Sequence, residues 1–201
     1  MAMFDRLKDQ AKNLQQSRSG RGGTGQAHTG QGYGAAGQAQ HGHAQGSSSS
    51  GSSGGSKAQL IGLFKTQLAS VKTELKSGAY RDASMAMCAL VAAADGYVEP
   101  AERQRVEELI VSNEVLQNFP ADQLRQRFNQ HVDRLTANFE QGKAEALREI
   151  AKAAKKPAEA RAVIQTGIVV AGADGHFEAS EQYAIRDACT TLGLSPTEFG
   201  I

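Results

Sequence analysis

A short acidic phrase occurs twice in this chain, and its two copies begin about 79 residues apart, at Asp95 and Asp174. Each copy follows an apolar run and reads Asp-Gly, one variable residue, one apolar residue, Glu, two variable residues, Glu. The six acidic positions are Asp95, Glu99, Glu102, Asp174, Glu178 and Glu181. An internal repeat indicates duplicated supersecondary units. The chain is therefore predicted to contain two similar helix-loop-helix units, each with three acidic groups at its turn.

The composition divides the 201 residues into three parts. Residues 17–56 are almost wholly Gly, Ser, Gln, Ala and His, which provide too little apolar surface to offset the entropy of ordering a backbone. This stretch is predicted to be a flexible, disordered linker. Residues 1–16 precede it as a short amphipathic helix. Residues 57–201 follow it and suit one helical domain with a single core.

The predicted helix over residues 1–16 has one apolar face. Three roles remain open for it. It packs on the main domain, binds a partner helix, or makes peripheral contact with a membrane surface, for which a single short helix is a weak anchor. The apolar face consists of Met3, Phe4, Leu7, Ala11 and Leu14.

The domain shows helical periodicity and no alternating strand pattern, so the prediction is an all-α bundle of about seven helices. Four are expected at about residues 58–76, 80–94, 158–173 and 179–192. Of the other three, one begins at Pro100, one begins at Pro120, and one contains Leu147. Residues 85–92 are apolar nearly all round, as are parts of 158–173, so these two helices should be central and buried.

Charge and cysteine usage exclude several classes of function. The net charge is +1 with both signs interspersed, which argues against a nucleic-acid partner. Cys88 and Cys189 lie in different predicted helices and are expected to be buried and reduced. No apolar run approaches the roughly 20 residues of a membrane span, and Asp5 and Arg6 interrupt any export signal. The protein is therefore predicted to be cytoplasmic.

The acidic loops have two interpretations, of which the first is structural. Each Asp-Gly ends an apolar helix, and glycine readily adopts the left-handed conformation found after a helix end. Glu99 and Glu178 then stand at the next helix start, with Glu102 and Glu181 three residues later. Carboxylates at these positions accept unpaired backbone N–H groups. In this interpretation the loops are helix caps.

The second interpretation is a divalent-cation site. The loops match the second half of the calcium-binding pattern Asp-x-Asp-x-Asp-Gly-x₅-Glu. The first half fails, because Val91 and Ala93 replace acidic ligands in the first copy and Val170 and Gly172 replace them in the second. An ordinary EF-hand is therefore excluded. Carboxylates without cysteine favour calcium, or magnesium, over zinc.

These features resemble the tellurite-resistance TerB family. The resemblance rests on the paired Asp-Gly-x-x-Glu-x-x-Glu motifs, the apolar helix before each, the opening residues 3–8 and the ending Leu-Gly-Leu-Ser-Pro-Thr-Glu-Phe-Gly at residues 192–200. It implies an all-helical domain of roughly twofold character that binds metal, with calcium as the expected ion, through the six acidic residues. The second loop has fewer Asp residues than is usual in short family members.

The same resemblance implies a role in resistance to tellurite and other chemical stress. The implied partners are a TerC-like membrane protein and TerD-like calcium-binding proteins, with the protein cytoplasmic or peripheral at the inner membrane face. No catalytic constellation is present in the sequence, so we expect a binding module and not an enzyme. The alternative is a metal-free helical scaffold or interaction protein whose acidic loops are only helix caps.

Overall fold

The computed structural model describes residues 53–174 and 177–201, with side chains described in 57–173 and 177–201. Every regular element in these residues is helical, which confirms the all-α prediction. The helix expected over residues 1–16 lies outside the described residues, as does most of the linker expected over 17–56. None of the described helices is long and apolar enough to cross a bilayer.

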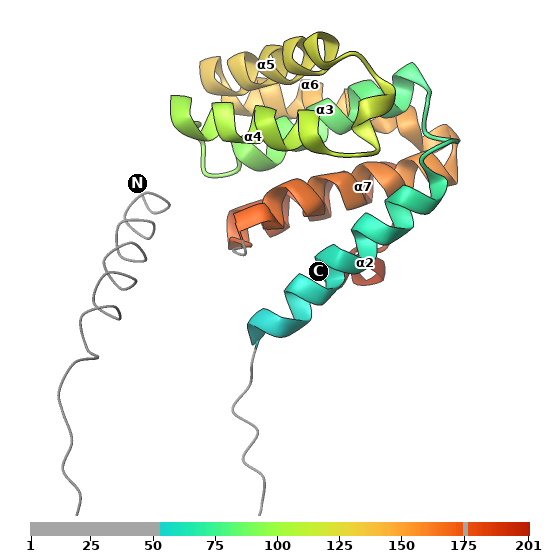
Figure 1. The fold of residues 1–201 in the computed structure, drawn as a ribbon. Helices are drawn as coiled ribbons and strands as arrows, with labels where there is room; N and C mark the ends of the chain where they lie inside the picture. Colours follow the sequence, from blue (N-terminus) through green and yellow to red (C-terminus); the bar gives the residue numbers. More distant parts are fainter. Residues whose placement is uncertain (1–52, 175–176) are drawn as a thin grey trace, which may run out of the picture. The chain divides into compact units, whose positions relative to one another are not determined.

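Seven α-helices follow one another in the described part of the chain (Figure 1). They are α2 (Ser53–Val71), α3 (Gly78–Ala92), α4 (Pro100–Ser112), α5 (Ala121–Ala137), α6 (Phe139–Ala151), α7 (Pro157–Ala171) and α8 (Ala179–Leu192). Four short 3-10 segments lie between or after them: η1 (Leu116–Asn118), η2 (Lys152–Lys155), η3 (Gly172–Asp174) and η4 (Pro196–Phe199).

The two apolar helices α3 and α7 form the centre of the domain, as predicted. Eleven of the fifteen residues in each are buried. Both are rich in Ala, so their backbones approach closely. At Gly167 of α7, an added Cβ would lie 2.7 Å from Cγ of Met87 in α3. A hydrogen bond of 3.0 Å between the hydroxyls of Tyr80 and Thr166 joins the same two helices inside the core.

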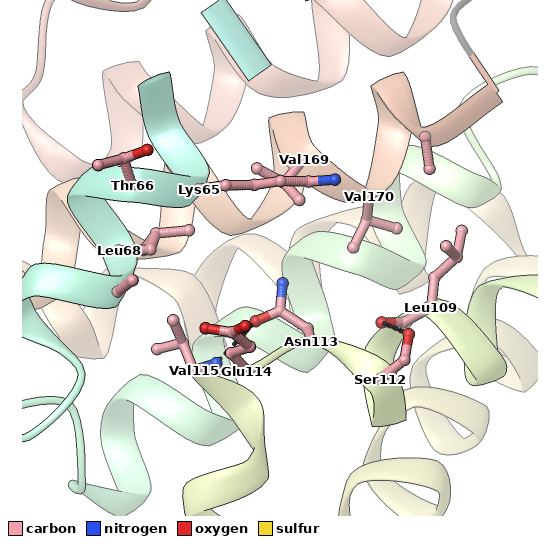
Figure 2. A pocket seen from close by; sticks show the side chains of 12 residues that line it. Lys65, Thr66, Leu68, Leu109, Ser112, Asn113, Glu114, Val115, Val169 and Val170 are labelled. Atoms are coloured by element: carbon pink, nitrogen blue, oxygen red, sulfur yellow. Dashed lines mark hydrogen bonds between the residues drawn. The ribbon is translucent and has the colours of Figure 1, made fainter. Parts of the chain in front are cut away.

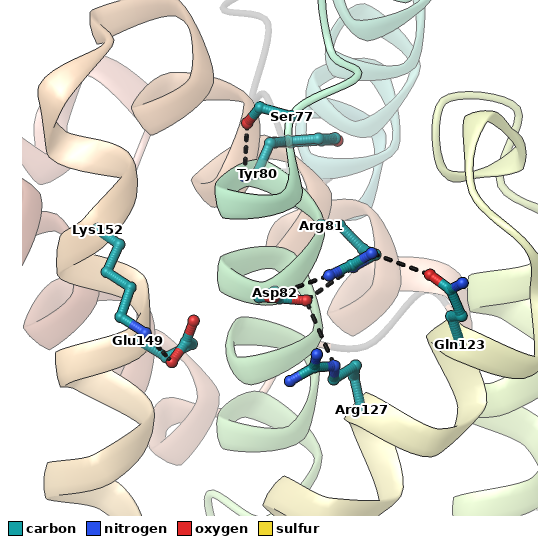
Figure 3. Close-up of polar contacts among 8 residues, drawn as sticks. All are labelled: Ser77, Tyr80, Arg81, Asp82, Gln123, Arg127, Glu149 and Lys152. Atoms are coloured by element: carbon teal, nitrogen blue, oxygen red, sulfur yellow. Dashed lines mark hydrogen bonds and ion pairs between the residues drawn. The ribbon is translucent and has the colours of Figure 1, made fainter.

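Polar contacts fix the start of α3 against its neighbours (Figure 3). The hydroxyl of Ser77 caps the helix by accepting a 3.0 Å hydrogen bond from the N–H of Tyr80. One turn later, Arg81 pairs with Asp82 at 2.7 Å and also donates a 2.9 Å hydrogen bond to Gln123 of α5. Arg127 of α5 approaches Asp82 at 3.7 Å. These contacts set the position of α5 along α3.

The outer helices α5 and α6 are amphipathic and meet at one shared residue. Asn138 ends α5 and caps α6, because its side chain accepts a 3.0 Å hydrogen bond from the N–H of Gln141. Gly142 allows the two helices to pack closely, since a Cβ there would lie 2.7 Å from Cα of Leu135. This tight αα-corner covers one side of α3.

Helix α2 differs from its predicted bounds. A helix was expected over residues 58–76, but α2 begins at Ser53 and ends at Val71. The segment just after the helix is held from outside: the side-chain amide of Asn118 donates to the carbonyls of Lys72 and Leu75, at 2.7 and 3.2 Å. The chain therefore turns at residues 72–74 before it reaches the predicted stop at Ser77-Gly78.

Candidate metal site at the two acidic loops

The first acidic loop is a tight turn between α3 and α4. The N–H of Gly96 donates to the carbonyl of Ala93 at 2.9 Å, and the φ of Gly96 is +92°, in the region that favours glycine. The carboxylate of Asp95 accepts a 3.1 Å hydrogen bond from the N–H of Tyr97. Val98 then turns into the core, with 8% of its surface exposed. The Asp-Gly pair thus forms the predicted helix stop.

Helix α4 starts immediately after this turn. Glu99 is its N-cap residue, with φ −66° and ψ 146°, and Pro100 occupies the first turn, where its missing N–H leaves no donor unpaired. The backbone N–H of Glu99 lies near the carboxyl group of Glu102 and acts to lower its pKa. A carboxylate in this position also suits the positive end of the helix dipole.

The three carboxylates of the first loop lie within electrostatic reach of one another. Burial is the main cause that raises the pKa of Glu102, and the negative charge of Asp95 raises it further. The charge of Glu99 acts in the same direction, while the N–H of Glu99 opposes it. Three negative groups around a half-buried position repel one another, and a cation, backbone N–H groups or solvent must relieve that repulsion.

The second acidic loop leads from α7 through η3 to α8. Glu178 is the N-cap residue of α8 and forms a capping box with Glu181. In this box the carboxylate of Glu181 accepts a 2.7 Å hydrogen bond from the N–H of Glu178. Glu181 is buried, with 9% of its surface exposed. The side chain of Asp174 lies outside the part that the structure describes.

The two loops correspond position by position. Glu99 and Glu178 are the N-cap residues of α4 and α8, and the carboxyl groups of Glu102 and Glu181 both lie near the N–H of those N-caps. The capping box that the first interpretation predicts is therefore present at the second loop. The structure also places both loops at the same end of the domain, where α3 and α7 finish (Figure 1).

The donor chemistry of the loops fits a hard divalent cation. Carboxylate oxygens are ligands that calcium and magnesium prefer, and the repulsion at Glu102 would favour a positive ion. Within the described side chains, no group of three or more His, Cys, Asp or Glu residues is arranged to hold a metal ion. The carboxylates of the first loop would therefore have to leave part of their present geometry to surround one.

Sequence reasoning missed the residue that holds the first loop in place. Arg103, next to Glu102, donates to the carboxylate of Asp133 at 2.7 Å and to the side-chain oxygen of Asn129, both on α5. These contacts fix the first turn of α4 on α5. No sequence signal identifies them, because the partners lie 26 and 30 residues away in a different helix.

The two cysteines do not belong to any site. Both are buried and unpaired, as predicted. Burial raises the pKa of Cys88 to about 12 and that of Cys189 to about 11. Thiolate is the reactive form of cysteine, so neither thiol is activated at neutral pH.

Comparison with known proteins gives one match. A protein-family model described as "Tellurite resistance protein TerB" matches residues 81–201, from α3 to the end of the chain. No curated protein and no solved structure matches the chain.

Proposed function

Because this chain belongs to the tellurite resistance protein TerB family, we propose that it is a cation-binding helical module of a bacterial chemical-stress response. Family membership makes it a helical domain associated with tellurite resistance. The further steps proposed here are that it binds a divalent cation, calcium or else magnesium, and that it acts by binding other proteins near the inner face of the cytoplasmic membrane.

The convergence of three carboxylates at one half-buried corner is the observation that carries this proposal. Asp95 and Glu99 both raise the pKa of Glu102, and the charge of Arg105 offsets only part of this effect, so the carboxylates act on one another at this corner. The same sequence pattern recurs at Asp174, Glu178 and Glu181. Helix capping accounts for the two Glu residues of each loop, and the Asp of each loop is the additional carboxylate.

The residues proposed to hold the cation are the six carboxylates, three in each loop. A bound cation would supply positive charge between them and contribute no chemistry of its own. Two features define the shape of the first loop: the positive φ of Gly96 allows its turn, and the side chain of Arg103 fixes α4 against α5. Because each loop joins a central helix to an outer one, occupancy would stabilise the packing of those helix pairs.

We propose action by binding and not by catalysis. Chemistry on tellurium oxyanions would call for an accessible, ionised thiol, whereas Cys88 and Cys189 are buried with raised pKa values. The proposed partners are a TerC-like membrane protein and TerD-like calcium-binding proteins. A pull-down of each, with calcium and with chelator, tests whether the cation controls the interaction.

One observation favours the alternative of a metal-free scaffold. The capping box of Glu178 and Glu181, with its 2.7 Å hydrogen bond, gives those carboxylates a structural role that needs no ion. The two functions differ in a simple measurement. A ligand that binds only the folded state raises the free energy of unfolding by roughly 2.7 kcal/mol at 100 times its dissociation constant, whereas a scaffold is unaffected.

The experiment is a thermal unfolding series of chelator-treated protein, with calcium and magnesium added separately up to millimolar concentration. A concentration-dependent rise of Tm is expected for the native chain. The rise should disappear in the double variant Glu102→Gln with Glu181→Gln, since Gln keeps a hydrogen-bond acceptor but loses the charge. Glu108→Gln and Glu140→Gln, which change exposed residues on α4 and α6, form the matched control. No rise of Tm in the native chain would establish the scaffold.

A further inference from the structure

We infer that α2 is a hinged strap, which moves away from the domain while α3 to α8 remain folded and thereby uncovers an apolar strip on α7. This device is separate from the proposed cation site and does not require it. It rests on how α2 is attached: weakly along its length, firmly at its C-terminal end, and by a shape-specific contact near its N-terminal end.

Along its length α2 is poorly buried. Among its described side chains, at residues 57–71, only Phe64 and Leu68 are buried, and Leu63 has half of its surface in solvent. By contrast, eleven of fifteen residues are buried in α3. Segments with few buried apolar contacts open at a lower free energy than the core does. Helix α2 is therefore expected to open at a lower free energy than the central helices α3 and α7.

A large pocket separates α2 from the helices opposite it (Figure 2). Its volume is about 510 Å³, and it lies between Leu68 of α2 and Leu109 and Val115 of the α4–η1 region, with Val169 and Val170 of α7 beside them. A smaller pocket of about 80 Å³ lies further toward the start of α2. Side chains that border such spaces lack part of their packing contacts, so α2 is held less tightly than a close-packed helix.

The C-terminal end of α2 is held firmly and forms the hinge. The side chain of Asn118 donates hydrogen bonds to the carbonyls of Lys72 and Leu75, and Leu75 itself has only 1% of its surface exposed. Just beyond, the hydroxyl of Ser77 donates a 2.8 Å hydrogen bond to the buried carboxylate of Glu159 in α7. The chain from residue 72 to residue 77 thus stays fixed when α2 moves.

A second set of contacts closes the strap near its N-terminal end. The side chain of Ile61 occupies the space that a Cβ on Gly172 would need, so α2 packs directly on the first residue of η3. The ammonium group of Lys57 lies 5.8 Å from the ring centroid of Phe177. The rings of Phe64 and Phe199 are 6.1 Å apart. This end of α2 is therefore held by the second acidic loop and the C-terminal segment.

Release of these contacts would change the surface of the domain. Ile168 and Val169 on α7, with Phe199, are now between 3% and 6% exposed, and they line the two pockets beside α2. Without α2 they would form an apolar strip that adjoins the second acidic loop. Opening of α2 would therefore exchange a covered apolar strip for a solvent-exposed one.

Native-state hydrogen exchange of the whole chain tests the hinge directly. Amides of α2 from residue 60 onward should exchange at least roughly tenfold faster than those of α3, through an opening that exposes less surface than global unfolding does. Amides at residues 75–77 should stay protected with the core. Equal exchange rates and equal denaturant dependence in α2 and α3 would overturn the proposal, because they would show one cooperative unit.

Substitutions at the closing contact test its role. Gly172→Ala should accelerate exchange in α2 alone, since the backbone at Gly172, φ −83° and ψ 7°, accepts alanine and only Ile61 is in the way. Adding Ile61→Ala should restore part of the lost stability. Gly62→Ala, at a site on α2 with no neighbouring atoms within 4 Å, is the matched control and should not accelerate exchange. Equal acceleration in α2 and α3 by Gly172→Ala would contradict a strap.

A covalent lock provides a second readout that does not depend on destabilised variants. The side chains of Gln67 and Gln165 share a 2.6 Å hydrogen bond between α2 and α7, and both native cysteines are buried. The double variant Gln67→Cys with Gln165→Cys can be cross-linked by a short bismaleimide. This cross-link should slow the hydrogen exchange of α2 to the rate of α3. If the cross-linked and uncross-linked proteins exchange alike in α2, the helix does not open separately and the inference fails.

Discussion

Tyr80 and Thr166 share a 3.0 Å hydrogen bond inside the core, across 86 residues of sequence, and so join the central helices of the two helix-loop-helix units. Neither hydroxyl reaches solvent, since both residues are 0% exposed. A buried hydroxyl that loses its partner costs about 1–3 kcal/mol. This bond therefore makes a measurable contribution to the packing of α3 on α7.

We expect Tyr80→Phe to lower the free energy of unfolding by about 1–3 kcal/mol, because it leaves the Thr166 hydroxyl unpaired. Adding Thr166→Val removes that hydroxyl as well and should recover part of the loss. Chemical denaturation of the native chain, both single variants and the double variant measures the coupling. Strictly additive losses would mean that the bond contributes nothing.

The same tyrosine predicts an alkaline transition. Burial raises the pKa of Tyr80 from 10.0 to about 12, with the Thr166 hydrogen bond acting in the opposite direction. Between these two values the unfolded chain loses the phenol proton and the folded chain keeps it. Stability is thus fully present below pH 10 and falls as the pH rises toward 12. Tyr80→Phe should flatten this part of a denaturation series. An unchanged slope would place the alkaline loss in other groups.

Glu102 should reduce the stability of the metal-free protein at neutral pH. Burial first, and then the charges of Asp95 and Glu99, raise its pKa. The pKa of Glu102 is therefore higher in the folded chain than in the unfolded chain, where it is near 4.5. This difference favours folding at a pH below 4.5 and disfavours it as the pH rises through the pKa of the folded chain. Glu102→Gln should raise the free energy of unfolding at pH 7 in chelator, by less than about 1 kcal/mol for a half-exposed group, and should not raise it at pH 4. Glu108→Gln is the control.

His131 should make the domain sensitive to mild acid. It is 7% exposed, its Nδ1 has no hydrogen-bond partner, and burial followed by the charge of Arg134 lowers its pKa. The carboxylates that face it, Glu149, Asp82 and Glu145, oppose that shift. As the pH falls through about 6.5, the unfolded chain takes up a proton before the folded chain does, so stability is lost.

The substitution His131→Leu removes this titration and the unpaired nitrogen together. We expect stability at pH 7 within about 1 kcal/mol of the native chain or above it, and a smaller loss of stability between pH 6.5 and 5. Urea denaturation at pH steps across this interval provides the measurement. If the native chain and the variant lose stability in parallel, His131 is not the group that titrates.

Cys88 and Cys189 should be unreactive in the folded protein. Both thiols are buried, and their pKa values are raised to about 12 and about 11 by burial. Ellman's reagent at pH 8 should therefore label two thiols only in denaturant. The single variants Cys88→Ala and Cys189→Ala identify which thiol any native-state reaction involves. Rapid labelling of both thiols in native protein would refute their burial.

The sequence predicted the central helices well because their local composition determines their burial. The run at residues 85–92 has no polar side chain, so α3 has no face that prefers water. Helix α8 was predicted at residues 179–192, which are its observed bounds. It starts at the capping box of Glu178 and Glu181 and ends at Gly193, whose φ is +69°. Local signals define both ends.

Helix α2 was predicted less accurately because its ends depend on distant residues. Leu75 continues the helical period of the sequence, yet it lies beyond the end of the helix. Its carbonyl is bound by the side chain of Asn118, which is 43 residues further along the chain. At the other end, the Ser and Gly residues from Ser53 to Ser56 have low helix propensity, and no local pattern indicates that the helix begins there.

The acidic loops were found by repetition, whereas their electrostatics depend on the fold. The spacing predicted both the caps and their carboxylates, and the capping box of Glu178 and Glu181 confirms the cap of the second loop. Their role in binding a cation stays a prediction. The half-buried position of Glu102 and the anchoring of its neighbour Arg103 by Asp133 come from tertiary packing. No one-dimensional pattern contains that information.

The hinge at the end of α2 has a mechanical consequence. Tension applied through the chain that precedes Ser53 would reach the domain at the end of α2 opposite to the anchored turn at Lys72 and Leu75. Such a pull would peel the helix off one contact at a time, from Lys57 and Ile61 toward Leu68. Peeling requires far less force than shearing the same contacts together, so the domain would yield there under loads that leave α3 and α7 intact.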